Sequence, residues 1–161
     1  MEFKIDTKDA FSIIVPLATT IDAKLADAIA AECTILRQNG SNCYIIDMQN
    51  LDTAPAEAIK KLVMLHEYIY SQGGSLVFTG ITTAFNAILK ETETSLLLNI
   101  APTMIEATDI VSMEILERDL MGESRLAAAY NRDYINKKKG ISMENKYPIC
   151  YLIFYRSTVI N

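Results

Sequence analysis

Short segments suited to β-strands alternate with longer segments suited to helices along the first 120 residues of this 161-residue chain. The strand-like segments span residues 1–6, 11–17, 43–48, 75–79 and 96–100. The helix-like segments span residues 21–38, 55–70, 82–90 and 102–120. Strands that alternate with helices favour a mainly parallel sheet with right-handed crossovers, and the two adjoining N-terminal strands favour an antiparallel edge hairpin. This order predicts an α/β fold with a mainly parallel sheet of about five strands and about four helices.

Turn and capping residues indicate where these elements begin and end. The apolar residues of the first helix recur every three or four positions from Ile21 to Leu36, and either Thr20 or Asp22 can cap it. Pro55 suits the first turn of the second helix, where no amide hydrogen is needed. Residues 43–48 form a continuous apolar run, which is typical of a strand covered on both faces.

The alternating pattern ends near residue 122. Residues 131–146 are polar and charged without a sustained apolar period, so we expect a linker there. Residues 148–160 are β-prone again, and residues 123–161 hold five of the eight tyrosines. We therefore expect a domain at 1–122 and a basic, tyrosine-rich extension at 123–161. The extension is either poorly ordered, an added edge strand, loosely packed on the domain, or a site for a partner.

Charge is divided unevenly between these two parts. Residues 1–122 carry 8 Lys and Arg against 17 Asp and Glu, a net charge of −9, whereas residues 123–161 carry 7 against 3, a net charge of +4. The acidic part would repel phosphates, and residues 137–139 form only one short basic cluster. We therefore expect no direct binding of nucleic acid.

The apolar segments are too short for a membrane span. The longest, residues 148–155, has eight residues, against the ~20 that cross a bilayer. The N-terminus lacks the basic-then-apolar layout of a signal peptide. The three cysteines, Cys33, Cys43 and Cys150, are too few and too scattered for a disulfide framework or a zinc site. These features predict a reduced, cytoplasmic protein.

The residue inventory opposes an enzyme. His66 is the only histidine, and a helix of about 100° per residue places it with Ile59 and Val63 on the side that we expect to face the core. General-base chemistry needs an oriented partner and a cleft, so we expect a structural role for His66. The sequence has no glycine-rich phosphate loop, nucleophile elbow or pair of metal ligands, which predicts no catalytic residue, cofactor or metal.

The turn Leu51-Asp52-Thr53-Ala54-Pro55 places a hydroxyl where a strand leads into a helix. Helix amides point toward such a turn and favour negative charge there. One interpretation is a helix cap, in which Asp52 or Thr53 accepts a hydrogen bond from a free amide and contributes ~1 kcal/mol. The other is a threonine that accepts phosphate at an exposed loop. The two roles are compatible.

Several segments together resemble a STAS domain, the fold of bacterial anti-sigma-factor antagonists. Residues 44–47 resemble the family's buried strand that ends in an aspartate, and Leu51-Asp52-Thr53 matches its apolar–Asp–Ser/Thr phosphoacceptor motif. Residues 73–80 resemble the strand after the second helix, and residues 101–107 resemble the opening of the last helix. The resemblance covers residues 1–120 of the 161.

The resemblance implies a non-catalytic switch protein. Family members bind an anti-sigma factor, typically a serine/threonine kinase, and phosphorylation of the Ser/Thr abolishes that binding. In this sequence Thr53 would be the phosphorylation site and Asp52 the aspartate beside it. Antagonists usually have serine followed by a Ser/Gly-type stretch, whereas Thr53 precedes Ala54-Pro55. A threonine at this position looks more like stressosome scaffold members of the family. The alternatives are therefore a stressosome-like scaffold that binds other STAS proteins, or an accessory subunit of a membrane transport system.

Helix angles suggest which face meets the partner. At about 100° per residue, Thr53 and four residues of the second helix fall within an arc of about 80°, opposite the side of Ile59 and His66. The four residues are Glu57, Lys60, Met64 and Tyr68. A methionine and a tyrosine in an outward stripe are suited to an interface. Together with Asp52, these five residues form the partner-binding surface that we expect.

Overall fold

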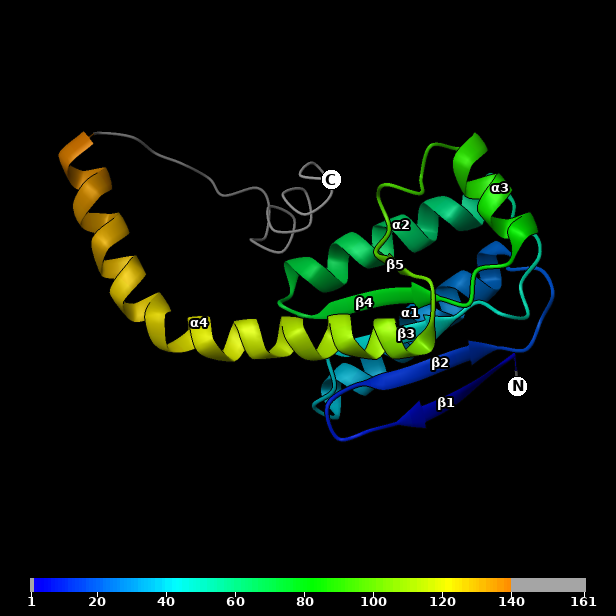
Figure 1. The fold of residues 1–161 in the computed structure, drawn as a ribbon, viewed down its shortest axis with the longest axis horizontal. Helices are drawn as coiled ribbons and strands as arrows, with labels where there is room; N and C mark the ends of the chain where they lie inside the picture. The colour runs from blue at the N-terminus through cyan, green and yellow to red at the C-terminus, as the bar shows by residue number, and fades with distance from the viewer. Residues whose placement is uncertain (1, 140–161) are drawn as a thin grey trace. The chain divides into compact units, whose positions relative to one another are not determined.

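The computed structural model describes residues 2–139, with side chains described for residues 2–121 (Figure 1). The elements are β1 (Phe3–Thr7), β2 (Ser12–Pro16), α1 (Ala23–Gln38), β3 (Cys43–Asp47), α2 (Ala56–Ser71), β4 (Ser75–Thr79), α3 (Thr83–Glu91), β5 (Ile100–Ala101) and α4 (Met104–Lys139). The chain divides into two compact units, Met1–Ser112 and Met113–Asn161. The first unit holds every strand of the described chain.

The five strands form one sheet in the order β1-β2-β3-β4-β5. β1 pairs antiparallel with β2, and the three remaining pairs are parallel. Each strand therefore lies beside the next one in the sequence, and α1, α2 and α3 connect successive parallel strands. This topology confirms the predicted α/β fold with its antiparallel edge hairpin.

The central strands are buried on both faces, as their continuous apolar sequences predict. Tyr44 and Phe78 belong to a core cluster that includes residues of α1, α2 and α3. Ile45 and Val77 point to the other face because side chains alternate along a strand, and both are fully buried. Ala107 and Val111 in the first turns of α4 are fully buried too, and Figure 1 shows these turns in front of the sheet, with α1 and α2 behind it.

The helix starts resolve the alternatives for capping. Asp22, not Thr20, caps α1, because its Oδ1 accepts a hydrogen bond from the Leu25 amide at 2.8 Å. Thr82 caps α3 in the same way, through the Phe85 amide at 3.2 Å. Pro55 stands at the N-cap of α2 and offers no side-chain hydrogen bond. The expected cap by Asp52 or Thr53 is therefore wrong, because the helix begins three residues beyond Thr53, at Ala56.

Two expectations near the end of the domain are also wrong. β5 covers only Ile100–Ala101 and not residues 96–100, because residues 95–97 form a turn instead. α4 does not end near Leu120 but continues to Lys139, so residues 131–139 are helical and not an irregular linker. This stretch lacks an apolar period but has many good helix formers and no proline. The β-prone segment 148–160 lies outside the described residues.

None of the helices in the described part of the chain is both long and apolar enough to cross a membrane.

Candidate functional site

Thr53 lies in the loop between β3 and α2, at the carboxyl end of the parallel strands. The amides of Asp52 and Thr53 both donate to the carbonyl of Thr19, at 2.8 and 3.3 Å. The Thr53 carbonyl in turn accepts a hydrogen bond from the Ile21 amide at 3.1 Å. Residues Thr20 and Thr53 thus form an isolated parallel bridge between the β2–α1 and β3–α2 loops.

The Thr53 side chain is exposed, although its backbone is held on both sides. Its hydroxyl lies 2.7 Å from the hydroxyl of Thr20, which is also exposed. One hydroxyl donates to the other, so a lone pair and one edge of the Thr53 oxygen stay open to solvent. A held backbone with an accessible hydroxyl presents Thr53 in one defined position.

Buried contacts fix the rest of the loop to neighbouring segments. Leu51 is fully buried, and its carbonyl accepts a hydrogen bond from the Thr82 hydroxyl at 2.8 Å. The Asn50 amide Nδ2 donates to the carbonyl of Pro16 at 2.9 Å. The loop is therefore tied to the end of β2 on one side and to the start of α3 on the other.

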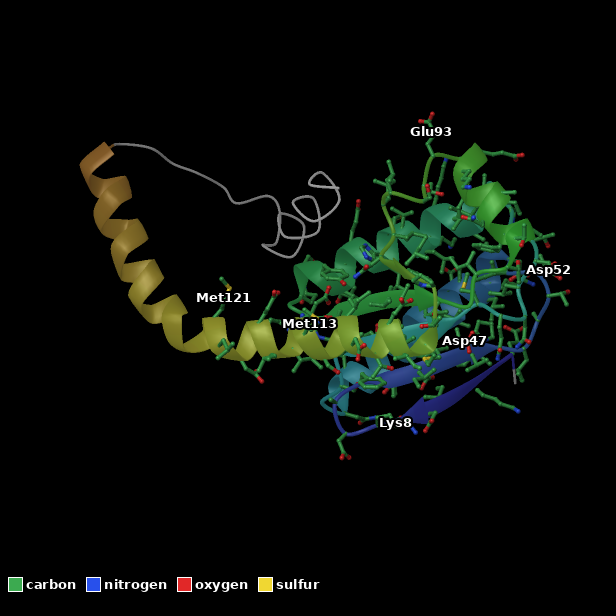
Figure 2. The ribbon with its side chains drawn as sticks, in the orientation of Figure 1. Lys8, Asp47, Asp52, Glu93, Met113 and Met121 are labelled. Carbon is green, nitrogen blue, oxygen red and sulfur yellow. The ribbon has the colours of Figure 1, made fainter. Side chains whose placement is uncertain are left out.

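Asp47 and Gly80 shape the base of the same loop. Asp47 Oδ1 accepts a hydrogen bond from the Gln49 amide at 3.1 Å, which tightens the turn after β3. Gly80 follows β4 with a φ of +66°, and a Cβ placed there would lie 2.5 Å from Asp47 Oδ1. Only glycine fits this position without strain. In Figure 2, Asp52 lies at the carboxyl end of the parallel strands, the end toward which the arrowhead of β2 points.

The outward face of α2 continues from this loop. Glu57, Lys60, Met64 and Tyr68 are all exposed, and Met64 and Tyr68 expose 67% and 50% of their surface. The opposite face buries Ala58, Ile59, Leu62, Leu65, His66 and Ile69. The expected division of α2 into a core side and an outward side therefore agrees with the structure. Thr53 is not part of the helical stripe, because it precedes the first residue of α2 by three positions.

Tyr68 differs from the other outward residues because it is linked to α1. Arg37 donates to the Tyr68 hydroxyl at 3.4 Å and to Gln72 Oε1 at 2.8 Å. A second link between the two helices joins Lys61 Nζ to Asp27 at 2.6 Å. These contacts restrict the aromatic ring while half of its surface stays exposed.

His66 is buried and packs against two aromatic rings. Its ring centroid lies 4.6 Å from that of Tyr70 and 6.5 Å from that of Phe78. Burial lowers the pKa of His66 to about 4, so the ring is neutral near pH 7. Its Nε2 has no hydrogen-bond partner in the described part of the chain. His66 therefore lies in the core with a neutral ring, which agrees with a structural role.

The thiols and carboxylates of the described residues form no metal site. Cys33 is buried, which raises the pKa of its thiol to about 12 and keeps it protonated. Among the residues that the structure describes, no three His, Cys, Asp or Glu side chains gather where a metal ion could bind.

Sequence reasoning missed Thr19 and the pairing of Thr20 with Thr53. Thr20 was considered only as a helix cap, although it lies 33 positions before its hydroxyl partner. A signal was available, because the segments after adjacent parallel strands leave the sheet at the same edge. The loops after β2 and β3 could therefore have been predicted to lie side by side.

No family model and no curated protein matches this sequence. Solved structures do resemble its fold. An anti-sigma factor antagonist from Mycobacterium paratuberculosis shares 15% identity at a TM-score of 0.57, over 68% of this chain and 92% of that chain. The anti-sigma factor antagonist SpoIIAA of Bacillus in its unphosphorylated form shares 15% identity at a TM-score of 0.55, over 68% and 96%. A STAS domain protein from Planctomyces limnophilus shares 16% identity at a TM-score of 0.53, over 65% and 92%.

These likenesses show that the chain has the STAS fold. SpoIIAA has been solved in a phosphorylated form as well, which matches at a TM-score of 0.50.

Proposed function

We propose that this chain is a non-catalytic regulatory protein of the cytoplasm that binds an anti-sigma factor kinase and releases it when Thr53 is phosphorylated. The observation that carries the proposal is the exposed Thr53 hydroxyl on a backbone fixed by three hydrogen bonds. A kinase needs an accessible hydroxyl, and a switch needs a position whose charge changes while its surroundings stay in place.

The covalent step is a phosphoryl transfer. The Thr53 oxygen attacks the γ-phosphorus of ATP, the bond to the β-phosphate oxygen breaks, and ADP leaves. The hydroxyl proton passes to a base of the kinase. The phosphate adds about 1.5–2 negative charges at pH 7.

The fold accommodates this charge because none of the bonds that hold the loop uses the Thr53 hydroxyl as an obligatory donor. The backbone bonds to Thr19 and Ile21 are unaffected, and the Thr20 hydroxyl can donate to a phosphate oxygen. The surface, in contrast, changes strongly. Asp52 is exposed beside Thr53, and Asp22 caps the neighbouring helix, so the phosphate adds to existing negative charge. A partner that binds the unphosphorylated loop would therefore be repelled by the phosphorylated loop.

The partner-binding surface that we propose comprises Asp52, Thr53, Glu57, Lys60, Met64 and Tyr68. At 1.5 Å per residue, the stripe on α2 extends about 18 Å from Ala56 to Tyr68. That length suits one side of a standard protein interface. Met64 and Tyr68 supply apolar area at one end, and Thr53 supplies the switch at the other.

The test combines phosphate incorporation with partner capture. Lysate of the native host and labelled ATP are applied to the wild type, Thr53→Ala and Thr53→Glu. Thr7→Ala is the matched control, because Thr7 is an exposed threonine on β1. It pairs with Ser12, the first residue of β2, and so lies at the opposite end of the strands from Thr53. We expect incorporation to be lost only in the two Thr53 variants, capture of a kinase by the wild type and Thr53→Ala, and none by Thr53→Glu.

Two results would contradict the proposal. The first is the same binding by all four proteins together with no phosphate at Thr53. The second is the capture of a different class of protein: other STAS proteins would indicate a scaffold, and membrane transport components would indicate an accessory subunit.

A further inference from the structure

The outer part of α4, residues 113–139, begins with an apolar stripe whose described side chains lie in solvent. Met113, Leu116 and Leu120 expose 63%, 58% and 64% of their surface. Their spacing of three and four residues places them on one side of the helix, and Figure 2 shows Met113 on this part of α4. Three large apolar side chains in a row form a continuous patch, unlike the scattered single residues that are normal on protein surfaces.

The same register continues through the rest of the helix. Counting on from Leu120 in alternating steps of three and four reaches Glu123, Ala127, Tyr130 and Tyr134. Six of the seven positions from 113 to 134 are therefore apolar or aromatic, and the backbone is helical through Lys139. A repeat of 3.5 residues over three turns or more is the sequence pattern of paired helices.

Charge divides the outer part of α4 into two halves of opposite sign. Residues 113–124 carry four acidic residues and one basic residue, a net charge of −3. Residues 125–139 carry five basic residues and one acidic residue, a net charge of +4. Two parallel copies would place like charges side by side, whereas two antiparallel copies place each acidic half beside a basic half.

We propose that two copies of this chain associate through the outer parts of their α4 helices in antiparallel orientation. Each helix carries the apolar stripe, an acidic half and a basic half. A dimer with one twofold axis therefore pairs the two stripes and both sets of opposite charges. At 1.5 Å per residue, the 27 residues cover about 40 Å along the path of the helix, which is almost four heptads. The proposal does not depend on the function of Thr53.

The first experiment measures the mass of the full chain by sedimentation from 1 to 100 μM. We expect a dimer whose dissociation constant increases at least fivefold between 0.05 and 0.5 M NaCl, because salt screens the paired halves. Leu116→Glu should increase the dissociation constant at least a hundredfold. Ile35→Glu is the matched control, since Ile35 is 49% exposed on α1, and it should leave the dimer unchanged.

Circular dichroism of each variant establishes that it is folded. A monomer over the whole concentration range, or a dimer that Leu116→Glu does not weaken, would overturn the proposal.

The second experiment determines the orientation by disulfide cross-linking in a Cys150→Ser background. Met113→Cys and Tyr134→Cys lie at opposite ends of the stripe. In an antiparallel pair, a mixture of the two variants cross-links to each other, and neither variant cross-links to itself. Cross-links of Met113→Cys with itself would instead indicate parallel helices and would overturn the antiparallel arrangement.

Discussion

The Thr53 loop and the outer part of α4 both expose surface to solvent, but different interactions hold the two regions in place. The loop is fixed by hydrogen bonds to two neighbouring segments and by the buried Leu51. The outer helix forms its backbone hydrogen bonds internally, and the described residues of its apolar stripe, Met113, Leu116 and Leu120, are exposed. A loop fixed in this way suits a switch in which a partner recognises a small chemical change at one residue. A helix with an open stripe suits association over a long surface.

The comparison predicts that stability resides in the first unit, and the predictions below test it from the largest expected effect to the smallest.

His66 should make the first unit sensitive to acid. Its pKa is lowered from 6.5 to about 4 by burial, so between these values the unfolded chain takes up a proton that the folded chain does not. Stability is therefore fully present above pH 6.5 and decreases as the pH falls toward 4, by about 3 kcal/mol for this group. Urea unfolding at several pH values, compared with His66→Phe, measures the difference. An equal pH dependence in both proteins would contradict this burial effect.

Gly80→Ala should destabilise the base of the Thr53 loop. An alanine here would have to adopt a φ of +66°, and its Cβ would contact the Asp47 carboxylate. We therefore expect the free energy of unfolding to decrease by about 2 kcal/mol. Gly40→Ala is the matched control, because Gly40 has a φ of +98° with nothing within 4 Å of an added Cβ. It should lose only about 1 kcal/mol, for backbone strain alone. Equal losses in thermal unfolding would show that the contact with Asp47 is unimportant.

Met64→Ala and Tyr68→Ala should separate binding from stability. Both side chains are at least half exposed, so each substitution should change the free energy of unfolding by less than about 0.5 kcal/mol. Each should weaken binding to the proposed kinase partner by about 1 kcal/mol or more. Calorimetric titration with the captured partner measures the binding. A large loss of stability with unchanged binding would place both residues in the core and remove them from the partner surface.

Removal of residues 123–161 should leave the folding of the first unit almost unchanged. The strands and the described core of the first unit all precede residue 113, so the shortened chain should unfold cooperatively. We expect its free energy of unfolding to lie within about 1 kcal/mol of the full chain when both are measured at concentrations where the full chain is monomeric. Aggregation of the shortened chain, or a much lower melting temperature, would show that the removed residues complete the fold.

The sequence by itself determined the order and type of the elements in the first unit. A continuous apolar run and a period of 3.6 are local properties, and the strand at Ser75–Thr79 and the inward side of α2 with His66 follow from them. The exposure of all six proposed partner-binding residues also agrees with helix angles and loop position. α4 was predicted too short because residues 131–139 are polar and charged without a sustained apolar period, and helix propensity alone is a weak signal.

Only the tertiary structure decided what surrounds Thr53. The local sequence suggested a helix cap, but Pro55 occupies the N-cap and Thr53 lies two residues before it. Its hydroxyl instead meets Thr20, which is 33 residues away. That pairing exists because β2 and β3 are neighbours in the sheet and their following loops leave by the same edge. A hydrogen bond between distant loops depends on which strands lie side by side, and no local pattern encodes it.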